Sequence, residues 1–249
     1  MQGSGEGYLN ISGNYSIFWQ ESLEANVTIA QITPDIDGDD NPDVLVHTIM
    51  YNLATNTTVA KVIAKKGSDG THFWEESVGG EGEIGVIFGS PAGDIDGDGL
   101  EDFIVSLLEI DPDIGITAEV IAKRGYNGTH LWEESIGGAE EIGVIFGLPA
   151  GDLDGDGWGD VLVHELGFNL TTNTTMSKVI AKEGYNGTHL WEESVGGAEE
   201  IGLIFGFPAG DLDGENGNDV LVLELGFNLT TNTTMSKVIA KEGYNGTHL

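Results

Sequence analysis

The sequence has no cysteine and few basic residues, and each shortage excludes a class of protein. Without cysteine the chain has no disulfide framework, no zinc–thiolate site and no thiol nucleophile. Nine Lys and Arg stand against 42 Asp and Glu, which gives a formal net charge of −33. Such a surface repels nucleic-acid phosphates and anionic lipid head groups, so cations are its natural partners. Any metal must be held mainly by oxygen atoms.

Long hydrophobic runs are also missing. No apolar run approaches the roughly 20 residues that a membrane-spanning helix needs. Residues 1–5 do not resemble a signal peptide, and we expect a trimmed or cloned start. Hydrophobic residues make up 39% of the chain, but Ile, Val, Leu and aromatic residues occur in short clusters, which argues against disorder. The composition therefore predicts a folded chain with a core.

The sequence consists almost entirely of four copies of one repeat. Residues 132–190 and 191–249 differ at only eight positions. Residues 74–131 form a third copy and residues 19–73 a diverged fourth. The tryptophans that open the copies lie 55, 58 and 59 residues apart: Trp19, Trp74, Trp132 and Trp191.

Each copy has the pattern of short strands separated by Gly, Asn and Asp. In the copy that opens with Trp132 we expect strands at residues 143–150, 161–166, 177–182 and 189–193. The dipeptide Asn186-Gly187 joins the last two, and it favours the positive φ angles of tight hairpins. The pattern predicts a four-stranded antiparallel meander of about 59 residues per copy. Radial stacking of four such blades predicts an all-β fold, a single β-propeller domain over residues 1–249.

The two ends of the chain match each other. The last copy stops at Leu249, where its fourth strand should begin, and residues 15–22 resemble that strand. We expect this N-terminal strand to complete the last blade within one chain. The same match between neighbouring chains would give a head-to-tail polymer, and two chains could instead form an eight-bladed homodimer. A slice of a longer repeat array would show the same complementary ends.

An acidic loop of nine residues connects the first two strands of every copy. Its carboxylates at positions 1, 3, 5 and 9 repel one another unless a cation lies between them. Ca²⁺ takes six to eight oxygens in flexible geometry, and a D-x-D-x-D opening with a backbone carbonyl at position 7 suits it. Position 6 must turn sharply and carries Asp40, Gly99, Gly157 or Asn216, which all tolerate the left-handed region. The loops hold 18 of the 42 acidic residues, so much of the negative charge is predicted to serve metal binding.

The sequence therefore predicts up to four Ca²⁺ ions, one per repeat. Mg²⁺ suits the loops less well because it keeps several waters, and a solvated acidic turn without an ion is the alternative. We expect a weaker fourth site, because Glu215 is one methylene longer than Asp and is followed by Asn216. The predicted ligands are Asp35, Asp37, Asp39, Asn41, Asp43, Asp94, Asp96, Asp98, Leu100, Asp102, Asp152, Asp154, Asp156, Trp158, Asp160, Asp211, Asp213, Glu215, Gly217 and Asp219.

The residues before three of the loops carry a resemblance to a known family. Residues 88–93, 146–151 and 205–210 read Phe-Gly-x-Pro-Ala-Gly and run directly into the acidic loop. This resembles the FG-GAP repeat of integrin α-subunit propellers, although the Gly-Ala-Pro order is replaced by Pro-Ala-Gly. The first copy has only residues 29–34 in this place. The resemblance implies a propeller with calcium ions on one face and recognition of protein or glycan partners elsewhere.

Asn-x-Ser/Thr sequons are dense on the predicted hairpin tips and suggest a glycosylated surface protein. The candidate glycosylation sites are Asn56, Asn127, Asn169, Asn173, Asn186, Asn228, Asn232 and Asn245. We expect an extracellular or cell-surface location and a role in adhesion or recognition of a protein or glycan. A structural repeat unit of a larger surface protein or fibre is the alternative. No catalytic constellation stands out from the repeat, so a polysaccharide-active or quinoprotein-like propeller enzyme has the least support.

Overall fold

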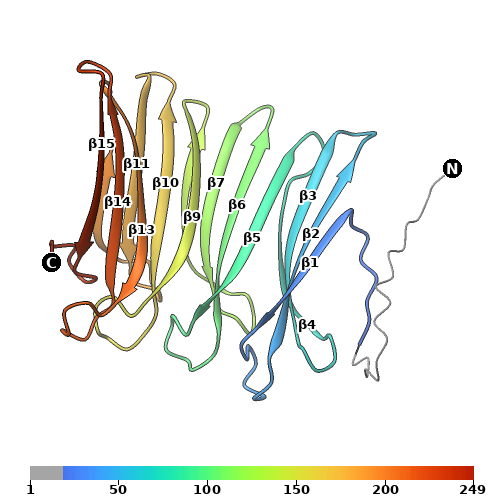
Figure 1. The fold of residues 1–249 in the computed structure, drawn as a ribbon. Coiled ribbons are helices and arrows are strands. Elements are labelled where there is room, and N and C mark those ends of the chain that lie inside the picture. Colours follow the sequence, from blue (N-terminus) through green and yellow to red (C-terminus); the bar gives the residue numbers. More distant parts are fainter. Residues whose placement is uncertain (1–18) are drawn as a thin grey trace, which may run out of the picture.

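The structure is a computed structural model that describes residues 19–249, which form an all-β fold of 15 strands (Figure 1). The strands fall into four units that follow the sequence repeats. Unit 1 contains β1 (Val27–Thr33), β2 (Asp43–Asn52), β3 (Thr57–Lys65) and β4 (His72–Val78). Unit 2 contains β5 (Ile84–Gly93), β6 (Asp102–Asp111), β7 (Gly115–Lys123) and β8 (His130–Gly138). Unit 3 contains β9 (Glu141–Gly151), β10 (Asp160–Asn169), β11 (Thr174–Lys182) and β12 (His189–Val195), and unit 4 contains β13 (Glu200–Gly210), β14 (Asp219–Asn228) and β15 (Thr233–Lys241).

Consecutive strands within a unit pair antiparallel. In unit 3, β9 pairs with β10, β10 with β11 and β11 with β12. These strands contain the four ranges that the sequence predicted for this copy. The turn between β11 and β12 has its glycine at φ +70°, as expected for Asn186-Gly187. Local pattern thus determines the strands and their order inside a unit, because β-branched runs and left-handed turn residues act over short distances.

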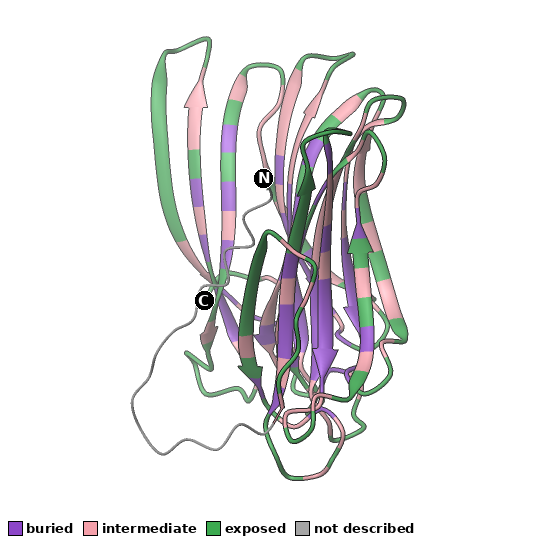
Figure 2. Cartoon of the chain, turned by 90° about the vertical axis from the view of Figure 1, so that its right-hand side faces the viewer, coloured by how far each residue is buried: buried purple, intermediate pink, exposed green. Residues whose placement is uncertain are grey.

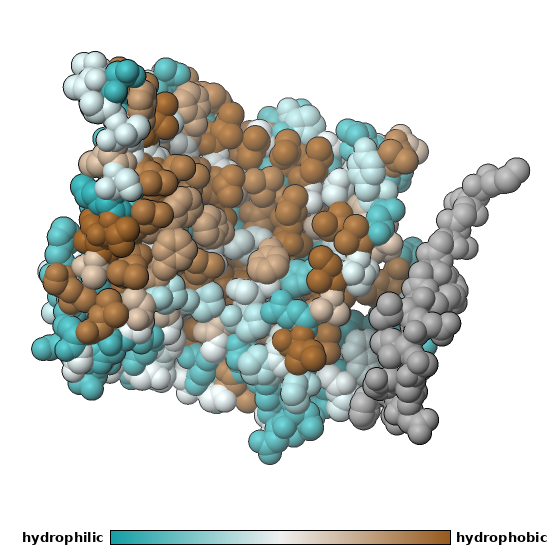
Figure 3. Space-filling view, viewed as in Figure 1, coloured by the Kyte–Doolittle hydropathy of each residue, from teal (hydrophilic) through white to brown (hydrophobic). Residues whose placement is uncertain are grey.

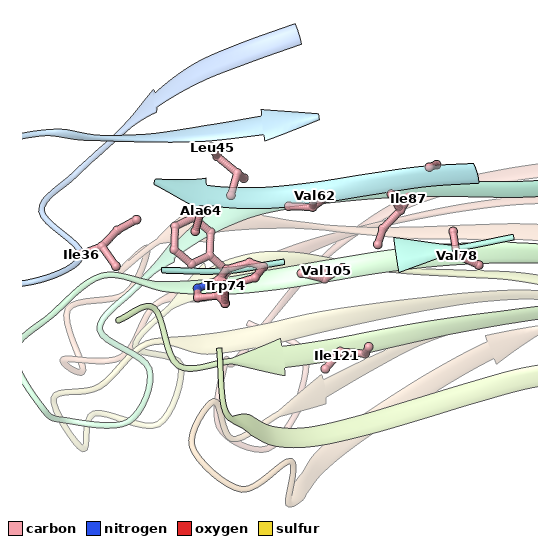
Figure 4. Packing of buried hydrophobic residues seen from close by; sticks show 11 residues of the cluster. Ile36, Leu45, Val62, Ala64, Trp74, Val78, Ile87, Val105 and Ile121 are labelled. Carbon is pink, nitrogen blue, oxygen red and sulfur yellow. The ribbon is translucent and has the colours of Figure 1, made fainter. Parts of the chain in front are cut away.

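The units stack face to face, and the hydrophobic core lies between them rather than inside one sheet. Between units 1 and 2, Leu45, Val62 and Val105 belong to one fully buried cluster (Figure 4). Phe103 belongs to the same cluster and is also fully buried. Similar clusters lie between units 2 and 3 and between units 3 and 4. Buried positions alternate with more exposed ones along several strands (Figure 2). Each unit therefore offers two apolar faces and depends on its neighbours to cover them.

The predicted closed β-propeller is wrong. The described strands form a mixed sheet of twelve strands, β1 to β12, and a separate sheet of β13, β14 and β15. Single bridges join the units in the larger sheet, Thr58 to Ile84 and Gly138 to Glu141. No ladder within residues 19–249 returns from unit 4 to unit 1, and the two lie at opposite ends of the row (Figure 1). A repeated sequence specifies contacts between neighbours, but the rotation from one unit to the next decides whether a row closes.

The segment that was expected to complete the last repeat lies partly outside the described residues, which begin at Trp19. Trp19 itself packs on unit 1, where its Nε1 donates to the Gly67 carbonyl at 2.8 Å. Glu21 forms an ion pair with Lys65 of the same unit at 2.7 Å. The described part of the segment therefore does not pair with β15 in the same chain.

Candidate metal centres

The four acidic loops lie at one end of the stack, each between the first and second strands of its unit. The aspartate at position 9 is the first residue of the second strand in every unit: Asp43, Asp102, Asp160 and Asp219. These four side chains are buried, none more than 2% exposed. These aspartates are buried because each is the first residue of an apolar second strand, which lies in the interior of the stack.

The position 9 aspartate connects its loop to the turn between the third and fourth strands. In unit 3, Asp160 Oδ2 accepts from Leu153 N at 2.7 Å, and Oδ1 accepts from Gly184 N at 3.1 Å. Asp102 makes the same pair of bonds in unit 2. Burial raises the pKa of both Asp102 and Asp160 to about 7, because desolvation outweighs the backbone hydrogen bonds. These residues therefore organise the loop as well as lying beside its other carboxylates.

Position 1 holds the loop in shape by accepting backbone hydrogen bonds. Asp152 Oδ1 accepts from Gly155 N at 2.7 Å and Oδ2 from Gly157 N at 2.9 Å. The residues at position 6 have positive φ in all four loops, which confirms the prediction of a left-handed turn there. Their φ values are +65° at Asp40, +85° at Gly99, +97° at Gly157 and +76° at Asn216.

The structure brings most of the predicted carboxylate ligands together. One oxygen from each member of a cluster lies within 4.8 Å of the others, close enough for a single cation to contact them all. Position 9 belongs to the cluster in units 2, 3 and 4, but Asp43 does not belong to that of unit 1. The clusters are Asp35, Asp37 and Asp39; Asp94, Asp96 and Asp102; Asp152, Asp154 and Asp160; Asp154, Asp156 and Glu183; and Asp211, Asp213 and Asp219.

The donor set suits a hard divalent cation. All the clustered ligand atoms are carboxylate oxygens, and the loops supply no sulfur or imidazole. In unit 1, Asp37 Oδ1 is buried and has no hydrogen-bond partner, which is the state of an oxygen that a bound cation would satisfy. The fourth loop is looser than the others, since Asn216 N lies 3.4 Å from Asp211 Oδ2, whereas the equivalent distance in unit 3 is 2.9 Å.

One position outside the loops divides the four loops into two kinds, and sequence analysis missed it. Lys66 and Arg124 occupy the first position of the turn after the third strand in units 1 and 2, and Glu183 and Glu242 occupy it in units 3 and 4. Aligning the four copies at this position would have revealed the change from a basic to an acidic residue.

In units 1 and 2 the chain supplies its own cation to the acidic loop. Lys66 Nζ contacts Asp37 and lies 2.6 Å from Asp39 Oδ2. Its hydrogen bond lowers the pKa of Asp39. In unit 2, Arg124 Nε donates to Asp96 Oδ2 at 2.5 Å and lies 3.7 Å from Asp98 Oδ2. A bound metal ion in these loops would compete with an internal ammonium or guanidinium group.

In units 3 and 4 the same position adds a negative charge instead. Glu183 joins a cluster with Asp154 and Asp156. Burial and the neighbouring Asp154 raise the pKa of Glu183, and burial and Asp213 do the same for Glu242. Among the described residues, no ion pair reaches either loop. These two loops are therefore the more negatively charged sites, and no basic side chain among residues 19–249 pairs with them.

Adjacent loops are connected to each other along the end of the stack. The backbone N–H at position 8 of one loop donates to the position 1 carbonyl of the loop before it. Glu101 N donates to the Asp35 carbonyl at 3.2 Å, and Asn218 N donates to the Asp152 carbonyl at 2.6 Å. The indole of Trp158 lies directly over Gly97 of the preceding loop, where a Cβ would meet it at 2.5 Å. Trp158 occupies position 7 of the third loop and was predicted to bind metal through its backbone carbonyl. Its side chain also connects the third loop to the second.

The candidate glycosylation sites lie in turns at both ends of the stack. Asn127, Asn186 and Asn245 lie in the turns beside the acidic loops, and the others lie in or beside the hairpin between the second and third strands. Asn56, Asn173 and Asn232 adopt positive φ in those hairpins. A turn role therefore accounts for part of the asparagine pattern without a glycan.

Exposed apolar side chains cover much of one side of the stack toward the end opposite the acidic loops (Figure 3). Two shallow hollows there are lined almost entirely by apolar atoms. One lies on unit 4 and the other between units 3 and 4, and both include Ile201 and Leu203. Sequence analysis did not indicate this surface.

Comparison with known protein-family profiles finds no match, and comparison with curated protein sequences finds no significant relative. Among solved structures, the chain is similar to the crystal structure of the exotype rhamnogalacturonan lyase YesX, with 12% sequence identity and a TM-score of 0.44. That match covers 89% of this chain and 41% of the lyase chain. A likeness this distant carries no conclusion about activity. Residues 19–249 contain no helix of the length and apolarity needed to cross a membrane.

Proposed function

We propose that this chain is a calcium-stabilised repeat module that acts in adhesion or recognition at the cell surface or outside the cell. The observation that carries the proposal is the recurrence of a clustered carboxylate loop at four equivalent places in an open stack. Like charges held this close destabilise a fold unless a counter-ion relieves them. Ca²⁺ suits the donor set because it accepts many oxygens in flexible geometry.

The two kinds of loop should differ in their affinity for Ca²⁺. Units 3 and 4 bind Ca²⁺ most readily, since Glu183 and Glu242 add carboxylate there. Units 1 and 2 bind more weakly because Lys66 and Arg124 already pair with the loop aspartates. The longer side chain of Glu215 weakens the fourth site relative to the third. Calcium therefore stabilises chiefly the C-terminal half of the stack.

The partner surface is the exposed apolar side of the stack. Contiguous exposed apolar patches on soluble proteins commonly mark interaction sites. Ile142, Val144, Ile201 and Leu203 are each about two fifths to one half exposed and lie on neighbouring units. Aliphatic side chains of this kind favour a protein partner over a glycan, whose hydroxyl groups need polar partners.

The test of the calcium proposal is thermal unfolding with excess Ca²⁺ and with EDTA, combined with elemental analysis. A ligand that binds only the native state raises the melting temperature by mass action. Mg²⁺ at equal concentration is the matched control, and it should raise the melting temperature less. An unchanged melt in EDTA, with no metal in the purified protein, contradicts the proposal. Protein and glycan arrays test recognition, and a chain that binds nothing on either array contradicts that part.

A structural unit of a larger surface assembly is the second candidate function. The observation that favours it is the open row of units, in which units 1 and 4 lie at opposite ends and do not pair (Figure 1). An enzyme of the polysaccharide-active or quinoprotein-like kind has no supporting site geometry among the described residues. Turnover of a polysaccharide or an alcohol by the purified chain would support an enzymatic function.

A further inference from the structure

The first strands of successive units carry half-exposed aliphatic side chains at equivalent places. The equivalent valines of units 1, 2 and 3 are Val27, Val86 and Val144, which are 47%, 51% and 46% exposed. Another unit follows each of these three units, so their exposure does not come from the row having an end (Figure 1). Ile84 and Ile142, two residues before the valines of units 2 and 3, are 38% and 42% exposed. We call these five residues the aliphatic row.

Carboxylates lie at the end of the aliphatic row that is remote from the acidic loops. Glu140 is exposed and directly precedes β9, and Glu81 is exposed shortly before β5. In unit 2, Glu83 also lies near Glu109 and Asp111. Desolvation raises the pKa of Glu83, and these two neighbouring carboxylates raise it further. The carboxylates at this end therefore repel one another.

The chain has no basic side chain left to neutralise them. All nine of its Lys and Arg residues form ion pairs within the chain. The pairs are Lys61–Glu75, Lys65–Glu21, Lys66–Asp37, Lys123–Glu76, Arg124–Asp96, Lys178–Glu165, Lys182–Glu134, Lys237–Glu224 and Lys241–Glu193. None of these pairs includes Glu81, Glu83 or Glu140. The surface therefore combines aliphatic side chains with negative charge that lacks a partner.

This combination selects the chemistry of a binding partner. A second copy of the chain has the same net charge of −33, so acidic residues would face acidic residues. An anionic membrane surface is repelled for the same reason. A glycan would leave hydroxyl groups unpaired against aliphatic side chains. A protein segment with Lys or Arg beside its own aliphatic residues complements both parts of the surface.

The spacing of the units favours a helical segment over an extended one. Stacked sheets lie about 10 Å apart, and seven residues of an α-helix rise about 10.5 Å. Apolar residues seven positions apart on one helix would therefore meet equivalent side chains on successive units, such as Val86 and Val144. In an extended segment, side chains on one face repeat about every 6.6 Å, which does not match that spacing.

We propose that the aliphatic row binds a basic amphipathic helix of a partner protein. The apolar face of the helix covers Val86 and Val144, and its Lys or Arg residues lie beside Glu81 and Glu140. The inference rests on the proposed function in recognition and names the class of partner. It does not depend on bound calcium, because the acidic loops lie at the other end of the stack.

Designed peptides test the partner class on the full chain. The probe is a peptide of three Leu/Lys heptads that forms an amphipathic helix. Its controls are a peptide of the same composition in shuffled order and a Leu/Glu peptide with the same pattern. Calorimetric titration in excess Ca²⁺ should show that the probe binds at least about tenfold more tightly than the shuffled peptide, because only the probe covers the aliphatic row. The Leu/Glu peptide should not bind. Equal binding of the shuffled peptide would overturn the proposal, since net charge alone would then explain the attraction.

Substitutions in the aliphatic row locate the binding site. Val86→Asp combined with Val144→Asp should weaken binding of the probe about tenfold or more. Tyr126→Asp combined with Tyr185→Asp is the matched control. It adds the same charge to the same two units at residues that are 41% and 44% exposed in the turns beside the acidic loops. The control should bind like the wild type. Equal affinity of the wild type and the valine variant would overturn the proposal.

A second pair of variants tests the contribution of charge. Glu81→Gln combined with Glu140→Gln should weaken binding about threefold and reduce its dependence on salt. Glu133→Gln combined with Glu192→Gln removes the same charge from exposed residues of β8 and β12, the fourth strands, and should change neither property. If both double variants change affinity equally, specific pairing at the row is contradicted.

The arrays separate failure of this inference from failure of the proposed function. A chain that binds nothing on the arrays contradicts recognition itself. A chain that binds an acidic protein or a glycan keeps recognition but loses this partner class, provided that the Val86→Asp and Val144→Asp variant abolishes the binding. A wild-type dimer in sedimentation that the same variant dissociates also overturns the proposal, because the row would then bind a second copy.

Discussion

Exchanging the charge at position 183 tests why two of the acidic loops differ from the other two. In unit 2 the equivalent residue is Arg124, which donates to Asp96 at 2.5 Å. In unit 3, Glu183 instead lies within 4.8 Å of Asp154 and Asp156. The variant Glu183→Arg therefore gives loop 3 the internal cation of loop 2. It should remove one Ca²⁺ site and at the same time stabilise the metal-free protein.

The two effects have opposite signs and different sizes. Calcium at 100 times its dissociation constant stabilises the native state by about 2.7 kcal/mol per site, so the variant should lose about that much of the calcium effect. Extracellular sites have dissociation constants on the order of 10⁻⁴ to 10⁻³ M, so a concentration 100 times larger is roughly 10–100 mM Ca²⁺. In EDTA the new arginine should contribute about 0.2–1 kcal/mol, the usual size of an exposed ion pair.

Urea unfolding in Ca²⁺ and in EDTA measures both effects, and calorimetric titration counts the ions. Glu199→Arg is the matched control, since it makes the same change of charge at the opposite end of the stack. It should change neither the number of ions nor the calcium effect beyond general screening. If Glu183→Arg binds as many Ca²⁺ ions as the wild type and gains as much stability from them, loop 3 is not a calcium site.

Three further predictions concern the stack itself. His164 is fully buried between units, and burial lowers its pKa to about 4. The unfolded chain binds a proton below about pH 6.5 and the folded chain does not, so stability should fall by about 3 kcal/mol as the pH drops from 6.5 to 4. His164→Leu, which copies unit 4, should remove that part of the pH dependence in urea unfolding, and an unchanged pH profile would contradict the assignment. Trp74→Ala should lower the free energy of unfolding by about 3–5 kcal/mol in urea, because Trp74 is only 5% exposed and joins units 1 and 2. A loss below about 1 kcal/mol would show that this contact contributes little. Gly187→Ala should destabilise the protein more than Gly82→Ala, although both glycines have positive φ. A Cβ at Gly187 would meet the Trp132 ring at 2.7 Å, whereas one at Gly82 would meet nothing within 4 Å. Equal melting temperatures of the two variants would refute the packing argument.

Several features of the candidate site could be predicted from the sequence because they depend on local geometry. The carboxylates of a D-x-D-x-D loop are close in the chain, so they remain close in the fold. The left-handed turn at position 6 follows from residue types such as Gly157 and Asn216 that tolerate it. The hairpin glycine at position 187 follows in the same way.

Other features of the site depended on contacts between distant residues. Lys66 contacts Asp37, which lies 29 positions earlier in the chain. The sequence of the loop itself therefore does not indicate that a lysine neutralises its aspartates. The buried Asp160 was predicted as a ligand, but its hydrogen bonds also fix the loop to Gly184. These pairings exist only because the meander brings its two turns to the same end of the unit.

The sequence by itself determined the repeat, the strands of each unit and the clustering of acid in four loops. Each of these arises from patterns that act over fewer than about ten residues, where β-branched runs and turn residues decide the backbone. The tertiary structure alone decided that the row stays open. Repetition specifies that every unit covers the next, but a small rotation at each interface, summed over four units, determines whether the last face meets the first. That sum places units 1 and 4 at opposite ends of the row, a consequence that no local pattern contains.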